Sequence, residues 1–163
     1  MAYVEDLIVD IRGWYMKAHN IVKLPKWKWE EVGGRVATRI VKDADKGIGA
    51  DGKKFDAYST EYKIKKSEGR AAPKGVSASR QTSPPNLRLT GTMLNSISAQ
   101  NATTTGVEII LRDGLKIEGN AKRGRDIHGV NPKNEKKFYK DISDHLGKNI
   151  DKYAKIPIEI SVG

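Results

Sequence analysis

Three stretches of the chain space their apolar residues by three and four positions, which is typical of amphipathic helices. They predict helices over residues 3–18, 25–47 and 133–153. Pro25 suits the first turn of the second helix, because the N–H that proline lacks would be unpaired there. The pair Asn131-Pro132 is a cap followed by a first-turn proline, and it predicts where the third helix begins.

Two later stretches alternate apolar and polar residues, which is the period of a strand. The first is Ala102–Arg112, and a return strand at Leu115–Ile117 is expected after the turn pair Asp113-Gly114. The second, over residues 156–162, predicts a closing strand. Helices at both ends of a few short strands indicate an α+β fold. We expect a small antiparallel sheet packed by two or three amphipathic helices.

Several local features refine this picture. Gly33-Gly34 interrupts the apolar stripe of the second helix and favours a close helix crossing over a bend. Asp51-Gly52 predicts a turn, after which Phe55 and Tyr58 are expected to anchor an extended segment on the core. A short helix capped by Thr90 follows, with three expected core residues: Met93, Leu94 and Ile97.

Residues 63–85 differ from the rest of the chain in composition. They are rich in Lys, Arg, Ser, Gly, Ala and Pro and almost lack large apolar side chains. Such a segment cannot bury enough surface to offset the entropy lost on ordering. It is expected to be a long, flexible basic arm that protrudes from one domain. The expected organisation is a helical extension (1–24), a core (25–62 and 86–163) and the arm (63–85).

The composition narrows the possible functions. A chain of 163 residues with 37% apolar residues has material for one modest core. It contains no cysteine, which excludes disulfides, thiolate metal sites and cysteine nucleophiles. No apolar run approaches the roughly 20 residues of a membrane span. The N-terminus lacks the pattern of an export signal, so we expect synthesis in the cytoplasm and no contact with a membrane.

The formal net charge of +10 is concentrated in two regions. The arm and its edges oppose Glu68 with seven cations: Lys63, Lys65, Lys66, Arg70, Lys74, Arg80 and Arg88. The stretch from Lys116 to Lys140 is also basic, and the loop at its centre carries three cations: Lys122, Arg123 and Arg125. These regions suit either a phosphate backbone or an acidic protein face. Neither contains interleaved aromatic residues, so a nucleic acid would be contacted through its backbone alone.

Residues for catalysis are scarce. His128 with Asp126 and Asn131 would make a poor nuclease motif, because a histidine followed by an asparagine is common by chance. Three carboxylates could hold a metal: Asp51, Asp56 and Glu61. Asp51 is better explained by its turn with Gly52, and Lys53 and Lys54 would compete for these charges. We expect no catalytic residue, no metal site and no cofactor.

Two short segments on either side of the basic stretch carry a family resemblance. The first contains an Asp-Gly turn followed by an aromatic pair and a serine: Asp51, Gly52, Phe55, Tyr58 and Ser59. The second has these residues in common with the family: Leu89, Thr90, Gly91, Met93, Leu94, Ser96 and Ile97. With the helix before them and the strand pair and helix after them, they resemble the bacteriophage virion-morphogenesis group. This group comprises Mu-type and related tail-completion proteins and the neck proteins of long-tailed phages.

The resemblance implies a structural virion protein, made in the bacterial host, that assembles as a ring, commonly of six copies. Such a ring lies at the neck or the top of the tail, around the DNA channel. Its implied partners are further copies of itself, neighbouring head-completion and tail tube proteins, and packaged DNA through non-specific contacts. Two alternatives stay open: a freestanding, sequence-independent DNA-binding protein, and a small metal-dependent nuclease using Asp51, Asp56 or His128.

Overall fold

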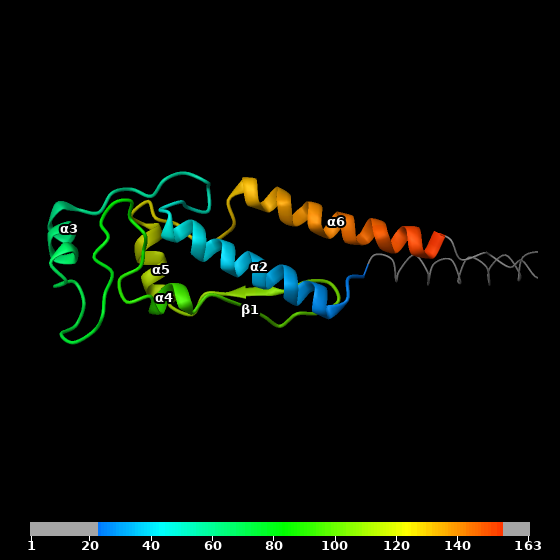
Figure 1. Ribbon diagram of the computed structural model, residues 1–163, viewed down its shortest axis with the longest axis horizontal. Coiled ribbons are helices and arrows are strands. Elements are labelled where there is room, and N and C mark those ends of the chain that lie inside the picture. Colours follow the sequence, from blue (N-terminus) through cyan, green and yellow to red (C-terminus); the bar gives the residue numbers. More distant parts are fainter. Residues whose placement is uncertain (1–22, 155–163) are drawn as a thin grey trace, which may run out of the picture.

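The computed structural model describes residues 23–154, which form an α+β fold with five helices and a two-stranded antiparallel sheet in this range (Figure 1). The predicted fold class is therefore confirmed. The expected helix over 3–18 and the closing strand over 156–162 lie outside the described residues. The elements are α2 (Lys26–Asp45), α3 (Thr60–Ser67), α4 (Thr92–Asn95), β1 (Ser98–Gln100), β2 (Glu108–Ile110), α5 (Gly114–Ala121) and α6 (Pro132–Ala154).

Helix α2 follows the prediction closely. Pro25 precedes its first turn in an extended conformation, and Gly47 leaves the helix with a φ of +71°, which favours glycine. One face of the helix is buried, with Val32, Ile40 and Ala44 turned inward. Ile40 and Ala44 belong to the apolar core of the described residues, together with residues of α4, α5 and the segment around Phe55.

The sheet differs from the prediction. The strand expected over Ala102–Arg112 is shortened to β2, and it pairs with β1, which precedes it, with Ala99 opposite Ile109. The return strand expected at Leu115–Ile117 is wrong, because Gly114–Ala121 is helix α5. The carbonyl of Asp113 accepts hydrogen bonds from the N–H groups of residues 116 and 117, both at 3.0 Å. Asp113-Gly114 therefore starts a helix, which buries Ile117 in the core and leaves Leu115 in solvent.

The close helix crossing predicted at Gly33-Gly34 is wrong, because within the described residues α2 comes close to the strand pair at Gly33. A Cβ atom at Gly33 would lie 2.8 Å from Ala99 Cβ and 2.8 Å from Val107 Cγ2. A Cβ atom at Gly34 would meet nothing within 4 Å. Gly33 therefore lets the helix lie directly on the strand pair.

Helix α6 begins where the Asn131-Pro132 pair predicts. Asn131 Oδ1 accepts a hydrogen bond from the Asn134 N–H at 3.2 Å, which caps the first turn. The side-chain amides of both residues donate to Asp43 Oδ2 of α2, at 2.6 and 2.8 Å. This buried carboxylate attaches the start of α6 to α2, and the two helices run side by side (Figure 1).

The segment expected to be a structureless arm from residue 63 starts with a helix. Ser59 caps α3 by accepting a hydrogen bond from the Tyr62 N–H, and the helix continues through Ser67. The prediction is therefore wrong for residues 63–67. Residues 68–85 contain neither helix nor strand, and the Ser79 N–H donates to the Leu89 carbonyl at 2.7 Å. Within 23–154, no helix combines the length and the apolar character that a membrane span needs.

Candidate interaction groove

The two segments that carry the family resemblance meet at one groove, which we call the motif groove. It has a volume of about 720 Å³ and lies between the Tyr58–Tyr62 segment, the Leu87–Met93 segment and α5. Its lining combines apolar, aromatic and basic side chains: Tyr58, Ser59, Tyr62, Leu87, Leu89, Thr90, Gly91, Met93, Leu115, Lys116, Gly119, Asn120, Arg123 and Arg125. Six of these residues belong to the two motifs: Tyr58, Ser59, Leu89, Thr90, Gly91 and Met93.

Tyr58 is a buried residue that lines the motif groove. Its hydroxyl oxygen accepts a hydrogen bond from the Leu87 N–H at 3.2 Å, which joins the two motif segments across 29 positions of sequence. The Tyr58 ring packs edge-on against the Tyr62 ring, with 5.0 Å between the two ring centroids. The Arg125 guanidinium lies 5.0 Å from the centroid of the Tyr58 ring. Burial raises the pKa of Tyr58, so this hydroxyl stays protonated at neutral pH.

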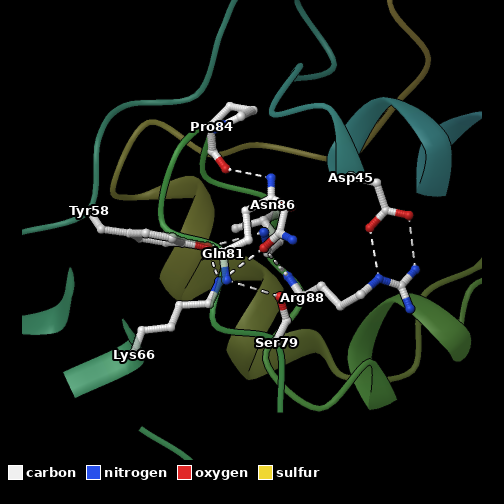
Figure 2. Close-up of polar contacts among 9 residues, drawn as sticks. Asp45, Tyr58, Lys66, Ser79, Gln81, Pro84, Asn86 and Arg88 are labelled. Carbon is white, nitrogen blue, oxygen red and sulfur yellow. Dashed lines mark hydrogen bonds and ion pairs between the residues drawn. The ribbon is translucent and has the colours of Figure 1, made fainter. Parts of the chain in front are cut away.

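Lys66 is buried behind this tyrosine, with 1% of its surface exposed. Its Nζ donates to Asn86 Oδ1 at 2.9 Å and to the Tyr58 hydroxyl at 3.3 Å (Figure 2). No ion pair to Lys66 is found among the described residues. Burial lowers the pKa of Lys66 to about 8. Lys66 was expected to be one of the arm cations that contact DNA or a neighbouring subunit. It instead connects α3 to the segment around Asn86 through a buried hydrogen bond.

Arg88 fixes the second motif segment to the end of α2. Its Nε and Nη2 donate to the two carboxylate oxygens of Asp45 at 2.8 and 3.0 Å, the bidentate geometry seen in Figure 2. The following turn places Gly91 at the cap of α4 with a φ of +86°. The prediction of Thr90 as the cap residue is therefore wrong. Its Oγ1 accepts a long 3.5 Å hydrogen bond from the Thr92 N–H, and Gly91 supplies the left-handed backbone.

The predicted core residues of the motifs are buried as expected: Phe55, Tyr58, Met93, Leu94 and Ile97. Asp51 and Gly52 make the predicted turn, in which Asp51 Oδ1 accepts from the Lys53 N–H at 2.9 Å. Ser59 caps α3, and the Ser96 hydroxyl donates to the Met93 carbonyl at 2.7 Å. Part of each motif therefore lines the motif groove, and the remaining motif residues lie in the core or form turns and caps.

The other predicted arm cations have different surroundings. Lys65 pairs with Glu61 and Arg70 with Glu68. Lys74 and Arg80 are exposed, Lys63 is half-buried, and the Arg80 guanidinium lies beside Gly69. These side chains are spread over α3 and the following loop and do not converge on one point.

The three cations of the second basic loop also differ in their exposure to solvent. Lys122 and Arg123 are exposed, and Arg123 lines the motif groove while donating to the Gly119 carbonyl at 2.8 Å. Arg125 is buried and donates to the carbonyls of Asp56 and Ala57 at 3.3 and 3.4 Å. It is therefore a structural residue that covers Tyr58.

Of the residues considered for a nuclease, His128 and Asp126 lie together, but Asn131 does not join them. His128 Nδ1 lies 2.6 Å from Asp126 Oδ1, but Asn131 is buried and turned toward Asp43. Glu61 pairs with Lys65 on the surface of α3. Over residues 23–154, no three His, Cys, Asp or Glu side chains gather in a way that could hold a metal ion.

The structure also places two functional candidates that the sequence analysis missed. Leu115 is 88% exposed at the edge of the motif groove, and it was missed because its segment was expected to be a strand. A basic groove between α2 and α6 is lined by Arg39, Lys42 and Lys137. The spacing of Arg35, Arg39 and Lys42 by four and three positions could have indicated one basic face on α2.

Comparisons with known proteins add no relative to this picture. No protein-family model matches the chain, and neither a curated protein nor a solved structure shows significant similarity to it.

Proposed function

We propose that this chain is a non-enzymatic structural subunit of a tailed-bacteriophage virion. It assembles as a closed ring at the neck or the top of the tail, around the DNA channel. Its partners are identical copies, the adjoining head-completion and tail tube proteins, and DNA through its phosphates. The proposal rests on the family resemblance of the two motif segments and on the place that they occupy in the fold.

The observation that carries the proposal is the convergence of the two motifs on one incompletely covered groove. The end of the first motif, residues 58–59, and the start of the second, residues 89–93, are separated by the basic segment, yet both line this groove. At its edge Leu115 is almost fully exposed, together with the cations Lys116 and Arg123. Leu115 and the half-buried Leu89 both line this groove, and apolar side chains that lie together inside a polar rim are typical of a protein contact site. If each copy covers the groove of the next, the contacts are head-to-tail and close as a ring when the rotation allows.

The test measures assembly of the full chain by size-exclusion chromatography with light scattering. We expect a single closed homo-oligomer, with six copies as the commonest expectation. Leu115→Ser removes the exposed apolar side chain and should reduce the assembled fraction by at least about tenfold, with less than about 0.5 kcal/mol change in unfolding free energy. Tyr139→Ser is the matched control, because Tyr139 is 64% exposed on α6 and does not line the motif groove.

Two results would contradict the proposal. One is a chain that stays monomeric at every concentration and is absent from purified virions. The other is a ring that Leu115→Ser leaves unchanged, since the motif groove would then not be the subunit contact.

A further inference from the structure

A second groove lies between α2 and α6, which run side by side (Figure 1), and we call it the helix–helix groove. It has a volume of about 690 Å³. Its lining is mostly charged: Glu31, Gly34, Arg35, Thr38, Arg39, Lys42, Asn134, Lys137, Phe138, Lys140 and Asp141. None of these residues belongs to the two motifs or to the predicted arm.

The charges of this groove are balanced at one end. Arg35 lies between two carboxylates, with Nη2 2.6 Å from Glu31 Oε1 and Nη1 2.7 Å from Asp141 Oδ2. Lys140 pairs with Asp144 one turn further along α6. This end therefore joins the two helices and has little charge left for a ligand.

The other end is basic and has no such balance. In the described part of the chain, Lys42 and Lys137 form no ion pair. Arg39 Nε lies 3.3 Å from Asp43 Oδ1, but the contact is not a hydrogen bond, and this buried nitrogen has no acceptor. The other oxygen of Asp43 is occupied by the amides of Asn131 and Asn134. Three cations from two helices thus face one groove, with one buried carboxylate to oppose them.

The arrangement favours an extended chain of negative charges over a single small anion. Arg39 and Lys42 lie about 4.5 Å apart along α2 at the helical rise of 1.5 Å per residue. On α6, Lys137 lines the groove, and Lys133 and Lys136, exposed outside its lining, continue the row of cations for about 6 Å toward the start of the helix. A guanidinium with free N–H donors binds phosphate oxygens well, and lysines add point charges around it. Phe138 is half-buried, so no exposed aromatic ring in the groove is available for base stacking.

We propose that the helix–helix groove binds the phosphate backbone of double-stranded DNA, with Arg39, Lys42 and Lys137 contacting phosphate oxygens. The contact is independent of base sequence. The inference deepens the proposed function by naming the surface that meets DNA, and it rests on that function for the source of the DNA. The DNA contact was expected at the arm and the second basic loop, and this inference places it between α2 and α6 instead.

The test measures binding of the full chain to a labelled duplex of about 30 base pairs by fluorescence anisotropy, from 50 to 200 mM salt. The groove variant is Lys42→Gln/Lys137→Gln, which removes two exposed cations that make no ion pair in the described residues. The matched control is Lys63→Gln/Lys74→Gln, which removes two arm cations that likewise make none there. Each contacted phosphate contributes about 0.9 to the slope of log affinity against log salt. We therefore expect the groove variant to reduce the slope by about 1.8 and to weaken binding at least tenfold, with the control unchanged.

Three results would overturn the inference: no duplex binding at 50 mM salt, equal binding by the groove variant and the unaltered chain, or a larger loss in the arm variant. Polyglutamate of matched charge serves as a competitor. If it displaces the duplex as well as unlabelled duplex does, the groove is a contact for acidic protein and the inference fails. Light scattering on the same samples separates this inference from the proposed function. A ring that forms without binding DNA contradicts the inference alone, and a monomer that binds DNA through the groove contradicts the ring alone.

Discussion

Lys66 shows how one buried side chain can make stability depend on pH. The two oxygens that accept hydrogen bonds from Lys66 each have a second donor. Asn86 Oδ1 also accepts from the Arg88 N–H at 3.2 Å, and the Tyr58 hydroxyl accepts from the Leu87 N–H. Burial lowers the pKa of the amine from 10.5 to about 8 in the folded chain. Between these two pH values the unfolded chain binds more protons than the folded one, so the unfolding free energy rises with pH. Lys66 therefore lowers the unfolding free energy by its full amount below pH 8, and this loss decreases as the pH rises toward 10.5.

We expect Lys66→Met to remove this pH dependence. The unaltered chain should gain on the order of 2 kcal/mol of unfolding free energy between pH 7.5 and 9.5 relative to the variant. Methionine has a similar length and leaves neither oxygen acceptor unpaired, so the variant should be at least as stable at pH 7.5. Urea unfolding of both proteins at intervals of half a pH unit measures the difference. Parallel stability curves for the two proteins would show that the amine is solvated in the folded state.

Lys66 also shows what composition cannot reveal about a single residue. In the sequence it belongs to a run of cations with few apolar neighbours, and it was therefore predicted to be exposed. Its environment is formed by Tyr58 and Asn86, which lie 8 and 20 positions away and approach it only in the fold. Arg125 was assigned to an exposed loop for the same reason, yet it covers the Tyr58 ring. Local charge density indicates where basic residues lie in the sequence but not which of them face solvent.

At the scale of elements, periodicity predicts helices well and strand pairing poorly. The positions of α2 and α6 follow from their apolar stripes together with proline and asparagine at their starts. The short stretch Leu115–Ile117 fits a strand and a helix equally well, because three residues cannot distinguish a period of 2 from one of 3.6. Here the burial of Ile117 in the core accompanies the helix. The strand β2 then pairs with β1, whose three residues are too few for their alternation to predict a strand.

The packing of α2 on the strand pair can be tested with two adjacent glycines. Gly33→Ala places a methyl group against Ala99 and Val107, and such overpacking costs about 1–3 kcal/mol. Gly34→Ala meets nothing within 4 Å and should stabilise the helix by up to about 1 kcal/mol. Since both substitutions bring the same gain in helix propensity, their difference isolates the steric contact. We expect Gly33→Ala to be the less stable by about 1–3 kcal/mol in urea unfolding. Equal stability would mean that α2 lies farther from the sheet.

At the scale of the whole molecule, both grooves join parts of the chain that are distant in sequence. The motif residues could be singled out because they lie in two short segments with a recognisable pattern. The helix–helix groove could not, because Arg39 and Lys137 are almost a hundred positions apart and each lies among unrelated charges. The Asp43 hydrogen bonds to Asn131 and Asn134 that bring α2 and α6 together also involve residues with no shared motif.

The loop after α3 provides a test of assembly that leaves the fold unchanged. None of residues 71–78 is buried, and few of their backbone hydrogen bonds reach beyond the segment. Replacing them with two glycines should change the unfolding free energy by less than about 1 kcal/mol, because no core contact is lost. If this loop contacts a neighbouring copy in the proposed ring, the shortened chain should remain folded but assemble at least about tenfold less well by light scattering.

A full-length chain with Lys74→Gln is the control, because it keeps the length of the loop and removes the one cation that lies within residues 71–78. Loss of assembly in the shortened chain alone would mean that the loop bridges subunits through its backbone and shape. Loss in both variants would mean that Lys74 pairs with an acidic residue of the neighbour. A shortened chain that unfolds would show that the loop supports the core. One that assembles normally would leave the motif groove as the subunit contact, since that surface is formed without residues 71–78.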